Sequence, residues 1–320
     1  MRFYQITACY EGYLDAFYRA HPEALDLPYA EHLRLLAGDG FGSGHLIAPY
    51  MEERGYETGY AIVNCRPLQE SWCREMGVPF PAWPQGLSDV AQLQVEAFAP
   101  DVLHLLDPIS FDSAFVRRLS RRPGLVLGWR AARIPEWVDW REFDVVLSSC
   151  RHCLRQADER GARRTVYSHP GFAPYLAQAV RDVPHEHDVV FCGSFTPEHA
   201  ARNRLLTEIA KAPLGLRDPF SPAFHLFTPK NPGARPAGVA MHDFGPRWGL
   251  DMYRALASGR VVVNAAIDMA DSEAPNMRLF EATGCGAFLL TERQFNLEAF
   301  FTPGEEVETF ADSAELLDKI

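Results

Sequence analysis

The sequence predicts an α/β protein built from two consecutive doubly wound domains. Short apolar runs alternate with helix-like stretches along most of the 320 residues, a pattern typical of parallel sheets with helical crossovers. The alternation is interrupted at 182–188 (DVPHEHD), a polar segment with a proline, and then begins again. We therefore expect one Rossmann-like domain over residues 1–183 and a second over 188–320. Ligands should bind beyond the carboxyl ends of the strands, in a cleft between the two domains.

In the N-terminal domain the strands are short apolar runs and the helices are the longer stretches between them, with Gly55 closing the first helix. Strands are expected at 2–8, 58–64, 102–106, 124–128, 145–148 and 165–167, and helices at 45–55, 90–98, 111–119 and 150–160.

The C-terminal domain repeats the alternation after residue 188. Its strands are expected at 188–192, 224–227, 260–264 and 287–291, and its helices at 198–211, 249–258, 276–283 and 313–320. The region 213–245 is rich in proline and glycine and lacks periodicity, so it predicts an irregular insertion or a loop.

Composition excludes several classes of protein. The formal net charge of -11 disfavours nonspecific binding to nucleic acid. No apolar run approaches the ~18 residues that span a bilayer, and the N-terminus lacks a signal-peptide pattern, so we expect a cytoplasmic protein without a transmembrane segment. Six arginines between Arg117 and Arg133 are either a solvated helix face or a contact with an anionic, phospholipid-linked acceptor, which leaves peripheral membrane contact open.

The segment 273–286 has a pattern with chemical meaning. Pro275 suits the first turn of a helix, which places Glu273 in the loop before it. The backbone N–H groups near Asn276 and Met277 would then hold a phosphate or another anion.

One and a half turns further into this expected helix, Glu281 lies on the same edge as Met277 and Arg278. Gly284 and Gly286 would end the helix before an apolar strand. Two carboxylates in this arrangement suit a polyhydroxylated ligand, because each accepts hydrogen bonds from the hydroxyls of a sugar or ribose.

This Glu-x7-Glu pair, with the glycine turn and apolar strand after it, resembles the donor-site signature of GT-B glycosyltransferases. The chain is most similar to the glycosyltransferases related to spore maturation protein CgeB. The similar stretches in the C-terminal half are 188–202 (DVVFCGSFTPEHAAR), 248–253 (WGLDMY), 264–270 (NAAIDMA), 276–284 (NMRLFEATG) and 303–310 (PGEEVETF). The N-terminal half contributes 68–77 (LQESWCREMG) and 144–149 (DVVLSS).

The resemblance implies roles for individual residues. Glu281 would bind the ribose of the donor nucleotide, and Glu273 would contact the transferred sugar. Backbone at Gly193 and Ser194 would approach the diphosphate or the base. Three basic residues would face the diphosphate or the charge of the leaving group: His199, Arg202 and Lys230. Because these groups stabilise the leaving diphosphate, we expect no essential metal and no cofactor beyond the donor, for which a UDP-sugar is the default. The sequence departs from the group at 265–266, two alanines where a histidine is frequent.

The acceptor side is less defined. A glycine-rich loop lies at 38–45 (GDGFGSGH). By the same resemblance its end, Gly42–His45, would line the cleft; the alternative is a flexible surface loop. Asp107 follows an expected strand and is a candidate general base for an inverting transfer, with His45 as its rival; a retaining transfer needs no such base. Trp129 and Arg130 either contact an acceptor sugar or serve packing and a surface salt bridge.

The sequence therefore predicts a metal-independent hexosyltransferase-like enzyme of polysaccharide biosynthesis, bacterial in type, that moves a sugar from a nucleotide-diphosphate sugar to a glycan, lipid-linked or protein acceptor. Two alternatives stay open: a nucleotide-sugar-binding module without catalysis, and a sugar-nucleotide epimerase of the same fold. Enzymes of this fold usually continue with helices beyond the expected final helix, so we expect the C-terminal domain to be truncated there.

Overall fold

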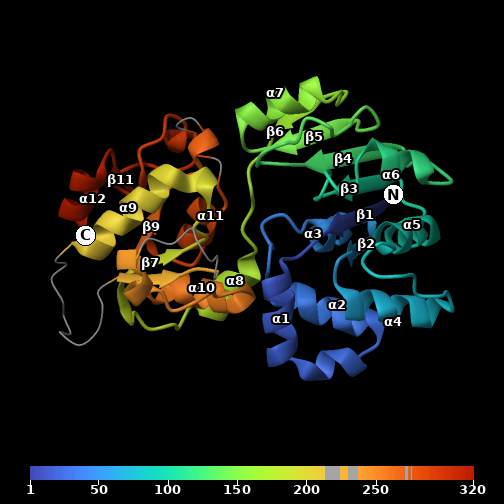
Figure 1. The fold of residues 1–320 in the computed structure, drawn as a ribbon, viewed down its shortest axis with the longest axis horizontal. Coiled ribbons are helices and arrows are strands. Elements are labelled where there is room, and N and C mark those ends of the chain that lie inside the picture. Colours follow the sequence, from blue (N-terminus) through green and yellow to red (C-terminus); the bar gives the residue numbers. More distant parts are fainter. Residues whose placement is uncertain (213–223, 230–236, 271–272, 275) are drawn as a thin grey trace. The chain divides into compact units, whose positions relative to one another are not determined.

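The computed structural model describes residues 1–212, 224–229, 237–270, 273–274 and 276–320. The chain divides into two compact units, Met1–His169 and Pro170–Ile320. Each unit is built on one sheet whose paired strands all run parallel (Figure 1). This confirms the predicted class of two consecutive parallel α/β domains.

The first unit has a six-stranded sheet in the order β2-β1-β3-β4-β5-β6. The strands are β1 (Arg2–Thr7), β2 (Glu57–Ile62), β3 (Val102–Leu105), β4 (Leu125–Trp129), β5 (Val145–Ser148) and β6 (Thr165–Tyr167). The chain passes from β1 to β2 on one side and then returns to β3 on the other. The loops after β1 and β3 therefore diverge, which is the arrangement that opens a ligand site in such sheets.

Helices connect these strands. They are α1 (Glu11–Ala20), α2 (Tyr29–Gly38), α3 (Ala48–Glu52), α4 (Arg66–Met76), α5 (Leu87–Phe98), α6 (Ser113–Arg118) and α7 (Arg151–Glu159), with the 3-10 turn η1 (Pro22–Asp26). The helix expected at 45–55 is the shorter α3, and α1, α2 and α4 were not among the expected elements. In α4 the buried face includes Gln69 and Ser71, so polar residues interrupt the apolar pattern that would reveal a helix.

The second unit has a five-stranded sheet in the order β11-β10-β9-β7-β8. The strands are β7 (His187–Cys192), β8 (Phe224–Phe227), β9 (Gly259–Asn264), β10 (Phe288–Glu292) and β11 (Glu308–Phe310). The helices are α8 (Pro174–Val180), α9 (Ala200–Lys211), α10 (Gly249–Ser258), α11 (Arg278–Gly284) and α12 (Ser313–Lys319), with the 3-10 turns η2 (Pro197–His199), η3 (Ala237–His242), η4 (Asp268–Ala270) and η5 (Leu297–Ala299).

Alternate residues of β7 face opposite sides of this sheet, as the period of a strand requires. Val190 and Cys192 join the core formed with α8, α10 and α11, whereas Val189 and Phe191 join the core formed with α9 and α12. Helices therefore cover both faces of the sheet, and β7 is buried on each side. This explains why its last four residues, Val189–Cys192, are a continuous apolar run.

The boundary between the units lies earlier than the expected 182–188 segment. Helix α8 belongs to the second unit, because Leu176 and Val180 are buried in the same core as Tyr253 and Leu279. The polar segment at 182–188 is thus the connection from α8 to β7, inside the second unit.

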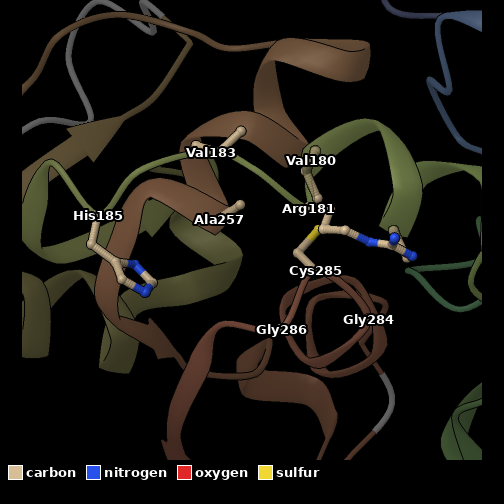
Figure 2. A pocket seen from close by; sticks show the side chains of 9 residues that line it. Val180, Arg181, Val183, His185, Ala257, Gly284, Cys285 and Gly286 are labelled. Atoms are coloured by element: carbon tan, nitrogen blue, oxygen red, sulfur yellow. The ribbon is translucent and has the colours of Figure 1, made fainter.

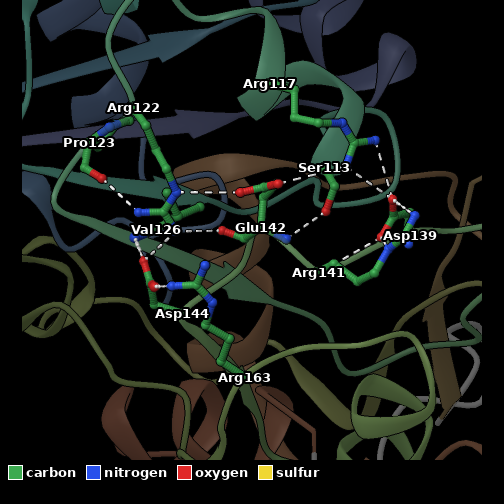
Figure 3. A network of polar contacts seen from close by, with 10 residues as sticks. All are labelled: Ser113, Arg117, Arg122, Pro123, Val126, Asp139, Arg141, Glu142, Asp144 and Arg163. Atoms are coloured by element: carbon green, nitrogen blue, oxygen red, sulfur yellow. Dashed lines mark hydrogen bonds and ion pairs between the residues drawn. The ribbon is translucent and has the colours of Figure 1, made fainter.

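Three of the six arginines in the arginine-rich stretch form ion pairs with acidic side chains: Arg117, Arg118 and Arg122. Figure 3 shows those of Arg117 and Arg122. Arg117 donates to Asp139 at 3.2 Å, and Arg122 donates to Asp144 at 2.9 Å. Hydrogen bonds from Arg141, assisted by those from Arg117, hold the pKa of Asp139 well below its ordinary value. The structure therefore favours the structural interpretation of this stretch over contact with an anionic acceptor.

In the described ranges, no helix has the length and apolar character needed to span a bilayer.

Candidate functional site

The strand order of the second unit reverses between β7 and β9, so the loops after these two strands bound the expected ligand site. Asn264, the last residue of β9, organises one side of it. Its side chain accepts a hydrogen bond from Asn276 Nδ2 at 2.8 Å and donates to Thr291 Oγ1 at 2.9 Å. The segment that enters α11 is therefore tied to the carboxyl end of β9. Asn296 supports it further by accepting from the backbone of Ala274 at 2.7 Å.

Helix α11 carries a buried ion pair. Arg278 Nη1 donates to Glu281 Oε2 at 2.7 Å, and the Tyr253 hydroxyl donates to Glu281 Oε1 at 3.3 Å. Burial is the largest single influence and lowers the pKa of Arg278, but the Glu281 carboxylate together with Cys192, Tyr253 and Cys285 outweighs it, and the pKa is raised. Each carboxylate oxygen accepts one of these two bonds and has capacity for a second. The expected side-by-side placement of Glu281, Met277 and Arg278 is what the structure shows.

Arg202 brings a second buried guanidinium to the same end of the sheet. It lies in the first turn of α9, is 7% exposed, and donates through Nη2 to the carbonyl of Ser194. Its Nε has no hydrogen-bond partner. Burial, and after it the positive charge of Arg278, lowers the pKa of Arg202 to about 10. Two buried guanidinium groups repel each other. A bound anion would offset this repulsion, so the pair is a candidate anion-binding site.

The other groups after β7 are already engaged. The N–H of Gly193 donates to the carbonyl of Phe227 at 3.2 Å. His199 Nδ1 is 2.7 Å from Thr196 Oγ1, and burial together with Arg202 lowers the His199 pKa to about 4. His199 is therefore neutral at pH 7 and adds no positive charge for a diphosphate.

The first turn of α9 is capped from within the chain. Asp268 accepts hydrogen bonds from the backbone N–H of Ala200 at 2.7 Å and of Ala201 at 3.2 Å. Beside it, Glu292 accepts from the N–H of Ala266 at 2.9 Å, and burial raises the pKa of Glu292.

The structure thus brings together most of the residues predicted for the donor. Glu273 is 3% exposed, and its carbonyl accepts from Gln294 Nε2 at 2.7 Å. Lys230 lies outside the described residues, as does Pro275. Sequence reasoning missed Tyr253, although it falls within the similar stretch 248–253, and it missed Asp268 and Glu292, for which no spacing pattern gives a signal.

In the first unit, Asp107 lies just beyond β3, as expected. It is half-buried, and its Oδ1 accepts from the N–H of Ser110 at 3.3 Å. His45 packs against Trp129 with ring centroids 3.8 Å apart, and burial lowers the His45 pKa to about 4. Arg130 donates to the carbonyl of Arg133 at 2.9 Å. One face of Trp129 is therefore occupied by His45, and Arg130 stabilises its own loop.

A cavity of about 320 Å³ opens at the other end of the second unit (Figure 2). Its lining includes Arg181, His185, Ala257, Cys285 and Gly286. His185 and Gly286 lie just before β7 and β10, so this cavity is at the amino ends of the strands and is separate from the arginine site. Burial raises the pKa of the Cys285 thiol to about 12, which leaves it un-ionised. Within the described ranges, no three His, Cys, Asp or Glu side chains gather in a way that could hold a metal ion.

The chain is similar to known proteins in part of its sequence and in its fold. A family model described as glycosyl transferase-like matches residues 218–320, which include Arg278 and Glu281. No curated protein matches the sequence. The similarity to the CgeB-related group therefore stays a prediction.

Among solved structures, the chain is similar to HepE of Anabaena in complex with UDP-glucose, with a TM-score of 0.56 and 11% identity over 100% of this chain and 88% of that one. Sucrose-phosphate synthase from Thermosynechococcus elongatus matches with a TM-score of 0.55 and 11% identity over 99% and 88%. AviGT4, a glycosyltransferase of avilamycin A biosynthesis, matches with 0.53 and 13% over 100% and 87%. The fold of the chain is that of the GT-B glycosyltransferases.

Proposed function

We propose that the chain is a glycosyltransferase that takes a sugar, a hexose in the first instance, from a nucleotide-diphosphate donor held in the second unit. The observation that carries this proposal is the pair of buried guanidinium groups, Arg202 and Arg278, at the carboxyl ends of β7 and β9. The glycosyl transferase-like match over 218–320 and the UDP-glucose complex of HepE support it, and they make UDP-sugars the first donors to test.

The side chains divide the work of holding a donor. Arg202 and Arg278 offset the charge of the diphosphate, and they stabilise it further as it leaves with the bonding electron pair. Glu281 has remaining acceptor capacity for ribose hydroxyls, and Glu273 is the candidate for contact with the sugar. Because two fixed cations serve the leaving group, we propose that transfer needs no metal.

The acceptor is a glycan, a lipid-linked glycan or a protein, as in polysaccharide biosynthesis. Asp107 and His45 in the first unit are the candidate bases if the transfer inverts the sugar. We place the activity in the cytosol, where the cysteines, all in the thiol form and mostly buried, stay reduced.

Calorimetry with UDP, GDP, dTDP and CMP, followed by turnover of UDP-glucose, tests the proposal. We expect UDP to bind and Glu281→Ala to weaken both binding and turnover. Glu298→Ala, at an exposed position of the same unit, is the control and should change neither. Binding without turnover would favour a module that has lost catalysis, and interconversion of the donor without an acceptor would favour an epimerase. Failure of every nucleotide to bind would refute the proposal.

A further inference from the structure

A buried glutamine organises the interior of the first unit. Gln5 lies on β1 and is 0% exposed. Its Oε1 accepts two backbone hydrogen bonds, from the N–H of Ile47 and of Ala48, both at 3.0 Å. Since only an oxygen accepts from two N–H groups, these bonds settle which end of the amide is oxygen and which is nitrogen.

The nitrogen end of Gln5 points to two histidines. Nε2 donates to the carbonyl of His45 at 2.7 Å, and it faces Nδ1 of His104 at 3.4 Å. An amide N–H that faces a ring nitrogen requires that nitrogen to be unprotonated. Burial, reinforced by His45, lowers the pKa of His104 to about 3, so the ring is neutral at pH 7. Its single N–H is therefore on Nε2.

Both histidines then present a shielded ring nitrogen without a partner. His104 is 2% exposed, and neither its Nε2 nor that of His45 has a hydrogen-bond partner. A buried donor left unpaired is costly, and such groups in native proteins usually mark an unseen water or ligand. His45 also ends the glycine-rich loop, where Gly40 and Gly42 adopt φ of 81° and 67°.

We infer that Nε2 of His104 and Nε2 of His45 together bind one hydroxyl group, which accepts from His104 and donates to His45. A hydroxyl is the smallest group that does both. Its source is either a water molecule or a hydroxyl of the acceptor, and the acceptor source rests on the proposed function. Gln5 is a positioning residue, because it sets the tautomer of His104 and holds the backbone of His45.

Two variants of His104 each keep a polar group at the position of only one of the two ring nitrogens. His104→Asn places an amide near Nδ1, so it keeps the contact with Gln5 and loses the Nε2 donor. His104→Gln places an amide near Nε2 and loses the contact with Gln5. Asn is smaller than Gln by one methylene, so His104→Asn leaves the larger cavity, and the loss of stability expected for one buried methylene is subtracted when the two midpoints are compared.

The 320-residue chain is measured in two ways: the denaturant midpoint, and kcat/KM for transfer from UDP-glucose to added methanol as a small hydroxyl acceptor. If the hydroxyl is the acceptor's, kcat/KM for methanol should be at least tenfold lower in His104→Asn than in His104→Gln, with equal affinity for UDP. If it is a water molecule, His104→Asn should have the lower denaturant midpoint at equal transfer, by more than the loss of one buried methylene explains. Equality of the two variants in both measurements would overturn the inference.

Two further measurements keep this inference distinct from the proposed function. Nitrogen-15 NMR of the histidine rings should show His104 protonated at Nε2 alone, and a proton on Nδ1 would contradict the inference. His32, which is 1% exposed and whose Nε2 is 2.7 Å from the Tyr18 hydroxyl, supplies the control. His32→Asn should leave methanol transfer unchanged. If the wild-type chain neither binds UDP nor turns over UDP-glucose, the proposed function fails, while the midpoints and the NMR spectrum still decide the hydroxyl site.

Discussion

The two units have the same parallel α/β architecture, but they place different kinds of side chain at the point where the strand order reverses. In each, the strand order reverses beside the first strand, between β1 and β3 or between β7 and β9. The second unit places charged groups there, the guanidinium groups of Arg202 and Arg278. The first unit places neutral groups there, the rings of His45 and His104 around Gln5. In the two proposals made above, the second unit accordingly binds a charged diphosphate and the first an uncharged hydroxyl.

The largest effect is expected from removing a charged group of the second unit. Arg278→Ala leaves the Glu281 carboxylate buried without its cation, because the two side chains are only 16% and 7% exposed. Breaking such a pair costs about 3 kcal/mol or more, measured as the free energy of unfolding in denaturant. Arg254→Ala removes an exposed pair with Asp251 at the same i,i+3 spacing and should cost less than about 0.5 kcal/mol. Equal losses for the two variants would show that Glu281 does not depend on Arg278.

The second prediction concerns the neutral histidines of the first unit and the pH dependence of stability. The pKa of His104 is about 3 in the folded chain and about 6.5 when unfolded. Below pH 6.5, His104 therefore binds a proton in the unfolded chain but not in the folded chain. The free energy of unfolding falls as the pH falls toward 3. Between pH 7 and 5, His104 should account for about 2 kcal/mol of this loss. His104→Gln should reduce the loss by that amount, whereas exposed His185→Gln should not. An unchanged pH dependence in His104→Gln would mean that His104 is protonated when folded.

The extent to which these sites were predictable depends on sequence distance. Glu281 and Arg278 are neighbours on one helix, so their contact follows from i,i+3 spacing. Strands β5 and β6 were predicted with their observed bounds, because each is a short apolar run between polar segments. Gln5 meets His45 and His104 across 40 and 99 residues, and no local pattern connects them. Gln5 and His104 become neighbours only through the parallel register of β1 and β3, which pairs them.

The third prediction concerns donor affinity. Arg202→Met keeps the packing over Phe191, whose ring lies 5.3 Å from the guanidinium carbon, and removes the charge. Loss of a charge-assisted contact to the diphosphate is worth about 2 kcal/mol, so the dissociation constant for UDP should rise about 30-fold in calorimetry. Arg204→Met, an exposed arginine of the same helix, is the matched control. An unchanged affinity in Arg202→Met would place the diphosphate away from the two guanidinium groups.

The smallest effect is expected from removing divalent cations. This experiment tests whether the two arginines of the second unit stabilise the leaving diphosphate without a metal. If Arg202 and Arg278 carry the electrostatic stabilisation of the leaving diphosphate, a divalent cation has no remaining task there. Prolonged dialysis against EDTA should then change kcat for UDP-glucose by less than about twofold, since a cation shared with the diphosphate would contribute several kcal/mol to the transition state. Restoring Mg²⁺ or Mn²⁺ afterwards should have as little effect. Loss of turnover in EDTA that Mg²⁺ or Mn²⁺ restores would show that the arginine pair acts with a metal, and the contrast between a charged and a neutral unit would then include the ion.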